Sequence, residues 1–266
     1  MLRCLPLLIA FPAFAFAQGT DPASGGRTPP FAEPETGSFR SPLAKKYKIA
    51  LVSGSLEYKS DDSLPILQKY LEENYAVECV RMFRKADDDI PGLDKLKDCD
   101  LAIFFTRRLT IDGDQLKMVK DYCASGRPIL GIRTASHGFQ KWLEMDKDVF
   151  GGDYKNHYKA GPKCEVTVNE KSKDNSILKG VKPYTSNASL YRNAKPAEDV
   201  TILMYGAIPG NKEPVAWVRE RKVNDKAQRV FYTSLGHPDD FQEKSFVKLL
   251  TNAVSWCMNA ETIMAK

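Results

Sequence analysis

The stretch PILGIRTASHGF (residues 128–139) predicts a short buried strand, a tight turn and the start of a helix, with Arg133 at the bend. A strand-turn-helix bend of this kind pushes its central side chain out above the sheet, where many α/β enzymes place a Ser or Cys nucleophile. Arginine stays protonated and can neither attack a substrate nor accept a proton. The bend therefore indicates an α/β scaffold without covalent thiol or hydroxyl catalysis at this position.

Alternating strand and helix patterns precede the bend. Apolar runs predict strands at 47–53, 77–83 and 101–106, and amphipathic segments predict helices at 60–74 and 112–126. Strands separated by single helices favour a parallel sheet that is covered on both faces. The sequence thus predicts an α/β fold: a doubly wound, mostly parallel sheet of flavodoxin-like type with helices on both faces.

The second half of the chain is richer in strands. A short helix is expected from the bend through Phe139 to Leu143, and the last helix is expected at 241–258. Between them, apolar runs predict strands at 164–168, 200–205, 214–218 and 229–234. The whole chain has 266 residues, of which 42% are hydrophobic, and this is enough for one sizeable core.

The N-terminus has the composition of a signal peptide. Residues 1–17, MLRCLPLLIAFPAFAFA, combine an early Arg, an apolar run and a small-x-small ending, so the mature chain is expected to begin at Gln18. A membrane anchor is the competing interpretation, but the run is shorter than the roughly 18–20 apolar residues that span a bilayer. We therefore expect a secreted or periplasmic protein with no membrane anchor after cleavage. Residues 18–44 are rich in Pro, Gly and Ser and predict a disordered linker, which leaves a domain at 45–260.

Charge and cysteine content exclude several classes of protein. Removal of Arg3 with the signal peptide changes the formal net charge from +5 to +4, and basic and acidic residues alternate along the chain, so no nucleic-acid partner is expected. Five cysteines remain, without a C-x-x-C pair. Cys79 and Cys99 could form a disulfide, but the pattern favours buried free thiols over a disulfide scaffold.

Candidate catalytic residues follow the strands, because ligands in such sheets gather beyond the carboxyl ends of the strands. Arg133 could hold a substrate oxygen or brace the loop. His137, about one helical turn further on, could transfer a proton or bond to a backbone carbonyl. His237 follows the last strand, and Asp239 or Asp240 could orient its imidazole.

Further polar and aromatic residues are expected around the same cleft. Glu57 could act as the acid or base that complements His237. The candidate substrate-binding residues are Tyr58, Arg107, Asn156, His157, Tyr191, Arg192 and Asp240. Such a mixture suits hydroxyl-rich ligands, since rings stack on sugar faces while arginines and amides bind hydroxyls. Ordinary loop composition is the competing interpretation.

No organic cofactor is predicted, because GSLEY (54–58) does not fit the dinucleotide-binding pattern. A divalent metal remains open, since the three histidines have acidic neighbours. No H-x-H or H-E-x-x-H spacing supports such a site.

Six segments in order resemble the ThuA-like (trehalose utilisation) family, a branch of the class I glutamine amidotransferase-like superfamily. They are SGSLEYKSDDSLP (53–65), LAIFFTRR (101–108), GRPILGIRTASHGF (126–139), FGGDYKNHY (150–158), SLYRN (189–193) and YTSLGHPDDF (232–241). The resemblance runs from about residue 48 to 257. In the parent superfamily the bend carries a Cys and a later motif reads His-Pro-Glu. Here Arg133 stands in place of the Cys, and Asp239 stands in place of the Glu in the later motif. Glutamine hydrolysis is therefore not expected.

The resemblance implies a role in carbohydrate metabolism, on a disaccharide or a 3-keto sugar. The leading hypothesis is a sugar-active enzyme that uses non-covalent acid/base chemistry. In it, His237 moves the proton, His137 or Glu57 is the counterpart, and Arg133 holds a substrate oxygen or a developing enolate. A non-catalytic carbohydrate-binding module and a metal-dependent hydrolase are the alternatives, and a homo-oligomer remains open.

Overall fold

The computed structural model of the chain describes residues 46–159, 162–193 and 195–259. The predicted signal peptide (1–17) and linker (18–44) lie outside the described residues, so their boundaries stay predictions. No helix in the described part of the chain is both long enough and apolar enough to cross a bilayer.

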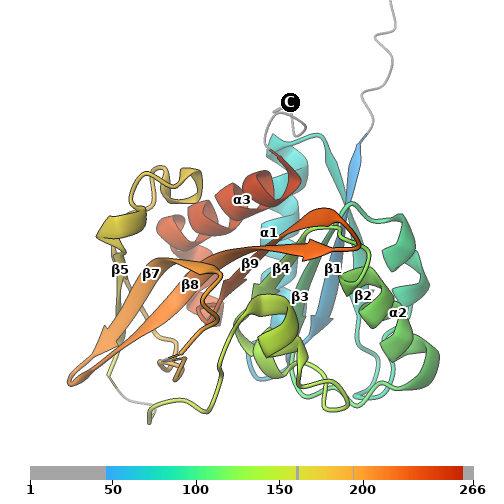
Figure 1. The fold of residues 1–266 in the computed structure, drawn as a ribbon, viewed down its shortest axis with the longest axis horizontal. Coiled ribbons are helices and arrows are strands. Elements are labelled where there is room, and N and C mark those ends of the chain that lie inside the picture. The colour runs from blue at the N-terminus through green and yellow to red at the C-terminus, as the bar shows by residue number, and fades with distance from the viewer. Residues whose placement is uncertain (1–45, 160–161, 194, 260–266) are drawn as a thin grey trace, which may run out of the picture. The chain divides into compact units, whose positions relative to one another are not determined.

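The described residues form one nine-stranded sheet in the order β2-β1-β3-β4-β9-β8-β7-β5-β6. Its strands are β1 Tyr47–Gly54, β2 Val77–Phe83, β3 Leu101–Thr106, β4 Ile129–Ile132, β5 Cys164–Val168, β6 Tyr184–Ser186, β7 Val200–Ile208, β8 Asn211–Val223 and β9 Lys226–Thr233. The α-helices are α1 Ser60–Asn74, α2 Gly113–Cys123 and α3 Lys244–Met258 (Figure 1). The α/β class predicted from the sequence is confirmed.

The sheet is mixed, so the expectation of a mostly parallel sheet is wrong. Strands β2, β1, β3, β4 and β9 pair in parallel. Strands β9, β8, β7, β5 and β6 pair antiparallel, with β7, β8 and β9 following one another as hairpins. The physical reason lies in the connections: a parallel pair needs a long crossover, whereas the short links in 200–233 can only reverse the chain. The parallel half still brings the carboxyl ends of β1, β3, β4 and β9 to one edge.

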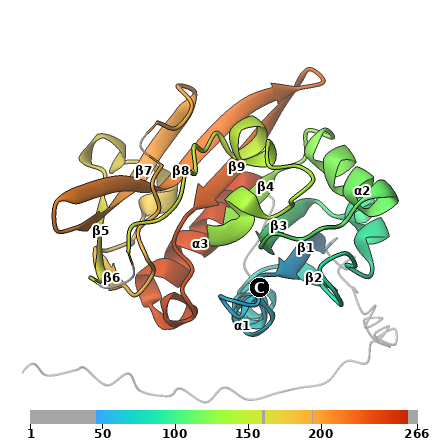
Figure 2. The same ribbon diagram turned by 90° about the horizontal axis from the view of Figure 1, so that it is seen from below.

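Two apolar clusters hold helices on the two faces of the parallel half. Leu64 and Leu67 of α1 share one cluster with Leu249 of α3. Leu116 and Val119 of α2 belong to the other cluster, together with the 3₁₀-helix Leu93–Asp98. Figure 2 shows α1 and α3 on one side and α2 on the other. The doubly wound arrangement as such stays a prediction.

The segment after the bend does not form the expected helix through Phe139 to Leu143. Arg133–His137 is a single 3₁₀ turn, and a separate π-helix covers Asp146–Phe150. Between them the backbone pairs with the loop after β3: Leu109 N donates to the Gly138 carbonyl at 2.8 Å, and Gln140 N donates to the Leu109 carbonyl at 2.8 Å. These bonds occupy groups that a continuing helix would use, so the chain leaves the helical path.

Every cysteine in the described residues is a free thiol. Cys79 is half-buried, and Cys99, Cys123, Cys164 and Cys257 are buried. Burial raises the pKa of the Cys99 thiol to about 11, so this group is an inert apolar side chain at neutral pH. The disulfide considered between Cys79 and Cys99 is not formed.

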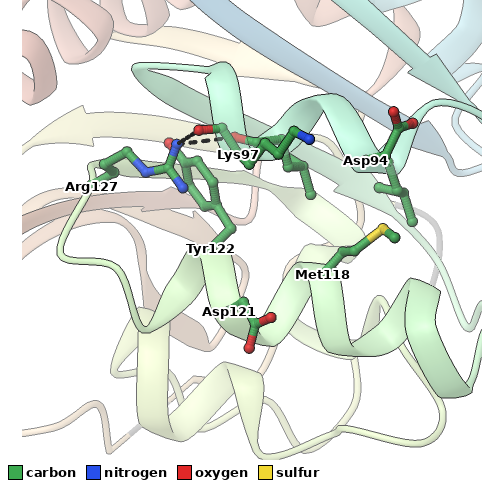
Figure 3. A pocket seen from close by; sticks show the side chains of 8 residues that line it. Asp94, Lys97, Met118, Asp121, Tyr122 and Arg127 are labelled. Carbon is green, nitrogen blue, oxygen red and sulfur yellow. Dashed lines mark hydrogen bonds between the residues drawn. The ribbon is translucent and has the colours of Figure 1, made fainter.

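A cavity of about 250 Å³ lies between the 3₁₀-helix Leu93–Asp98 and α2 (Figure 3). Arg127 lies at one end of it, and its Nη1 donates to the carbonyls of Leu96 at 3.1 Å, Lys97 at 2.8 Å and Cys99 at 2.9 Å. The same guanidinium lies 4.4 Å from the centre of the Tyr122 ring. Because these residues precede β3 and β4, the cavity lies at the amino ends of the strands, opposite the bend. Arg127 therefore has a structural role.

Replacement of Arg127 by Lys is expected to lower the free energy of unfolding by about 1–3 kcal/mol, since carbonyl groups at the end of the 3₁₀-helix lose their donor. Urea unfolding measures the change. Lys97→Ala is the matched control, because only its backbone carbonyl takes part and its side chain is exposed. Equal stability of the Arg127→Lys variant and the wild type would contradict this role.

Candidate functional site

The predicted bend is present, and its backbone is strained. Arg133 follows β4 with a φ of 48°, a left-handed conformation that residues with a side chain rarely adopt. Its carbonyl accepts a hydrogen bond from Tyr232 Oη at 2.5 Å. Gly236 packs beside it, and a Cβ atom at Gly236 would lie 2.7 Å from Ile132 and 3.5 Å from the Arg133 Cβ. The bend thus has the geometry of a nucleophile elbow without the nucleophile.

The Arg133 side chain is fully buried. Its Nη1 donates to the Ser234 carbonyl at 2.7 Å, and its Nη2 donates to Tyr58 Oη at 2.9 Å and to Ser189 Oγ at 3.0 Å. The guanidinium lies 4.1 Å from the centre of the Tyr58 ring and 4.6 Å from that of Tyr191. All these partners are neutral, and Nε has no hydrogen-bond partner among the described residues.

Arg133 therefore braces several loops at once. Tyr58 follows β1, Ser234 follows β9, and Ser189 and Tyr191 belong to the segment after β6. A substrate could reach the guanidinium only if Tyr58 or Ser189 moved aside. The bracing role is what the geometry shows, and contact between Arg133 and substrate stays a prediction.

His137 is the last residue of the 3₁₀ turn and is only 8% exposed. Its ring stacks on Tyr154 with centroids 4.4 Å apart, and its Nδ1 lies 3.1 Å from Ser136 Oγ. Burial, reinforced by Arg108, Arg107 and Arg133, lowers the pKa of His137 to about 3. The imidazole is therefore neutral at physiological pH and a weak base, which favours a hydrogen-bonding role over proton transfer.

Asp146, which the sequence did not single out, holds Tyr154 against His137. It is 7% exposed, and its Oδ2 accepts the Tyr154 N–H at 2.8 Å. Its Oδ1 is buried without a partner among the described residues, and a Cβ atom at Gly152 would lie 2.1 Å from that oxygen. Burial raises the pKa of Asp146 to about 6. The only sequence signal for this contact is the glycine at 152, which says nothing about its partner.

A cavity of about 340 Å³ lies beside His137, at the carboxyl ends of β3 and β4. Its lining comes from the loop after β3, the segment after β4 and the loop before β5. The lining residues are Arg108, Ser136, His137, Gln140, Leu143, Asp146, Tyr154 and Lys155. The volume falls within the range of small-molecule sites, about 300–1,000 Å³.

His237 directly precedes the 3₁₀-helix Pro238–Gln242 and caps it. Its Nδ1 accepts the Asp239 N–H at 3.3 Å and lies 3.3 Å from Asp239 Oδ2. Asp240 does not reach the imidazole, because its Oδ2 accepts the backbone N–H groups of Gly236 at 2.8 Å and His237 at 2.9 Å. Burial raises the pKa of Asp240. Of the two acids that the sequence offered, Asp239 contacts the ring and Asp240 fixes the loop.

Glu57 and Arg107 form an ion pair. Glu57 Oε2 lies 2.6 Å from Arg107 Nε, and both side chains are partly exposed. The sequence predicted a base at Glu57 and a substrate contact at Arg107. The structure brings the two together, so each offsets the charge of the other.

The remaining predicted residues lie on an exposed pair of segments. Asn156 and Arg192 pair through their backbones at 2.9 Å, and the Arg192 guanidinium lies 4.5 Å from the centre of the Tyr158 ring. His157 Nδ1 lies 2.7 Å from the Tyr158 carbonyl. Tyr191, whose backbone forms a bridge with His157, is 2% exposed and contacts Arg133 and Tyr154. Of this group, only Tyr191 belongs to the buried layer around Arg133.

Residues 48–257 match the family described as ThuA, trehalose utilisation. The chain belongs to the ThuA family. Two solved ThuA-like proteins share the fold: one from Parabacteroides merdae, at 18% identity and a TM-score of 0.63 over 81% of this chain and 91% of that one, and one from Bacteroides uniformis, at 17% identity and a TM-score of 0.60 over 80% and 92%. No curated protein matches the sequence.

In this ThuA-family chain, no group of three or more His, Cys, Asp or Glu side chains among the described residues could hold a metal ion. The structure thus identifies no metal site there, and metal binding stays a prediction.

The pKa of Asp146 makes stability depend on pH. Because the folded value of about 6 lies above the ordinary 3.8, the folded state favours the protonated acid. Its contribution to stability is complete below pH 3.8 and is lost as the pH rises through 6, by up to about 3 kcal/mol. The isosteric Asp146→Asn variant should lack this loss. Urea unfolding between pH 4 and pH 7 measures it, and parallel pH profiles for variant and wild type would contradict the assignment.

Proposed function

We propose that this ThuA-family protein is a secreted or periplasmic enzyme that acts on a disaccharide or keto-sugar by non-covalent acid/base chemistry. The observation that carries the proposal is the strained elbow, which retains its shape while a buried arginine occupies the nucleophile position. The family's link to trehalose utilisation supports a sugar as substrate. Since a guanidinium cannot attack an amide, glutaminase activity is not expected.

The chemistry that fits such a site starts beside a carbonyl. A base removes the proton from the carbon next to the keto group, and the electron pair moves onto the carbonyl oxygen to give an enolate. Protonation of the former carbonyl carbon, with loss of the proton from the neighbouring hydroxyl, moves the keto group and isomerises the sugar. Expulsion of the glycosidic oxygen at the β position, with protonation of that oxygen, instead cleaves the glycosidic bond and leaves an enone. Neither route needs a covalent intermediate with the enzyme.

His237 is the residue we assign to proton transfer. Its side chain is 31% exposed at the carboxyl end of β9, and the Asp239 carboxylate lies 3.3 Å from Nδ1, where it can stabilise an imidazolium. The positive charge of Arg133 would stabilise the enolate.

A carbohydrate-binding module is the second candidate, and one observation favours it. The low pKa of His137, about 3, and the packing of its ring on Tyr154 are typical of a structural histidine. A binding module would keep these features and have no turnover. No cluster in the described residues favours a metal-dependent hydrolase.

The test is a turnover screen with 3-keto and unmodified disaccharides. His237→Asn keeps a side-chain acceptor for the helix cap but cannot shuttle a proton, so kcat should fall about 10²- to 10⁴-fold. Lys117→Gln is the control, because this exposed side chain lies on α2 and pairs with Asp121, and it should retain the wild-type rate.

Two outcomes would contradict the proposed enzymatic mechanism. Sugar binding without turnover across the panel supports the binding module, and equal rates for His237→Asn and wild type would remove His237 from the mechanism.

Secretion is tested separately. The full-length gene, expressed in a bacterium that has an outer membrane and a periplasm, should yield a mature protein that begins at Gln18. Intact mass and N-terminal sequencing of the periplasmic or secreted fraction measure this. An uncleaved chain recovered with the cytosolic proteins would contradict the proposed location.

A further inference from the structure

Arg108 has a constrained backbone at the mouth of the cavity beside His137. Its φ of 50° places it in the left-handed region, which residues with a side chain rarely adopt. Its N–H donates to the His137 carbonyl at 2.9 Å, and the next residue, Leu109, donates to the Gly138 carbonyl at 2.8 Å. The two bonds hold this conformation, and the Arg108 side chain lines the cavity. Backbone strain of this kind is often found at ligand sites.

The charge of Arg108 is not neutralised by the protein. Its guanidinium makes no hydrogen bond or ion pair with a described residue, whereas the neighbouring Arg107 pairs with Glu57 at 2.6 Å. Arg133, behind the cavity, has only neutral partners. After burial, Arg108, Arg107 and Arg133 are the next causes of the lowered pKa of His137, so all three positive charges lie near this ring.

The two acids near the cavity, Asp153 and Asp146, interact with neighbouring groups of the protein. Asp153 lies 2.6 Å from Lys155 Nζ, so this pair adds no net charge. Asp146 turns Oδ2 to the Tyr154 N–H and Oδ1 to Gly152, so both oxygens face the loop backbone. At neutral pH the Asp146 carboxylate offsets one positive charge, and Arg108 and the buried Arg133 together leave an excess of one positive charge around the cavity. Arg108 is exposed, so salt will screen its attraction to an anion.

We infer that the cavity beside His137 binds an oxyanion carried by the sugar substrate, a carboxylate or a phosphate, through the Arg108 guanidinium. The inference rests on the proposed function and narrows its substrate class to acidic sugars. The planar guanidinium can donate two parallel hydrogen bonds to such a group. Ser136 lines the same cavity, but its Oγ already donates to the Arg133 carbonyl at 3.4 Å and lies 3.1 Å from His137 Nδ1, so Arg108 supplies the open donors.

The experiment compares glucose, glucuronate, glucose 6-phosphate and inorganic phosphate by calorimetric titration of the full mature chain. Wild type should bind at least one acidic sugar about tenfold or more tightly than glucose, with affinity falling as salt rises. Arg108→Gln should lose this preference, and Arg108→Lys should recover part of it. Lys69→Gln on α1 makes the same change in net charge at an exposed position and should behave as wild type.

The outcomes of this titration distinguish the anion-site inference from the proposed sugar substrate. Sugar binding without a preference for acidic sugars, or a preference that survives in Arg108→Gln, overturns the inference and leaves the proposed function standing. Phosphate binding that depends on Arg108, with no sugar bound, supports the anion site and overturns the sugar substrate. No binding of any probe overturns the inference, while the turnover screen with disaccharides decides the proposed function separately. A thermal unfolding curve confirms that Arg108→Gln is folded.

Discussion

The buried guanidinium of Arg133 is the interaction on which the carboxyl end of the sheet depends. Burial of a charge is unfavourable unless hydrogen bonds and polarisable groups replace water. Here the Ser234 carbonyl, two hydroxyls and the faces of Tyr58 and Tyr191 do so. Since these partners come from three separate parts of the chain, one side chain fixes the loops after β1 and β9 and the segment after β6.

Because Arg133 is buried, the groups that can react with a ligand lie beside the elbow and not at its central position. A nucleophile at the elbow would have to face the ligand, whereas Arg133 lies beneath a layer of aromatic rings. The groups that remain open to a ligand lie on either side: His237 on its capped turn, and the cavity that contains His137, Asp146 and Arg108. A shared elbow geometry is therefore compatible with a different reaction, because the fold fixes the position and the side chain decides the chemistry.

The local field inverts the usual order of acidity in the cavity. Burial and three arginines lower the pKa of His137 to about 3, while burial raises that of Asp146 to about 6. The carboxyl group thus holds a proton more tightly than the imidazole. A histidine in an α/β loop is commonly taken as the proton carrier, but in this protein its environment makes it a neutral hydrogen-bonding group, and an acid from the π-helix titrates closer to neutral pH.

The sequence by itself determined the elements whose periodicity is local: β1 to β4, the helix α1 at 60–74, and the elbow with its arginine. It also determined membership of the ThuA family, because ordered motifs survive where overall identity to solved relatives is low. Only the tertiary structure decided the antiparallel half of the sheet, the broken helix after His137, the pairing of Glu57 with Arg107 and the role of Asp146. The broken helix and the Glu57–Arg107 pair depend on contacts between residues distant in sequence. The antiparallel half depends on the full strand lengths, which leave only short links between β7, β8 and β9, and the role of Asp146 depends on its burial; no local pattern contains either.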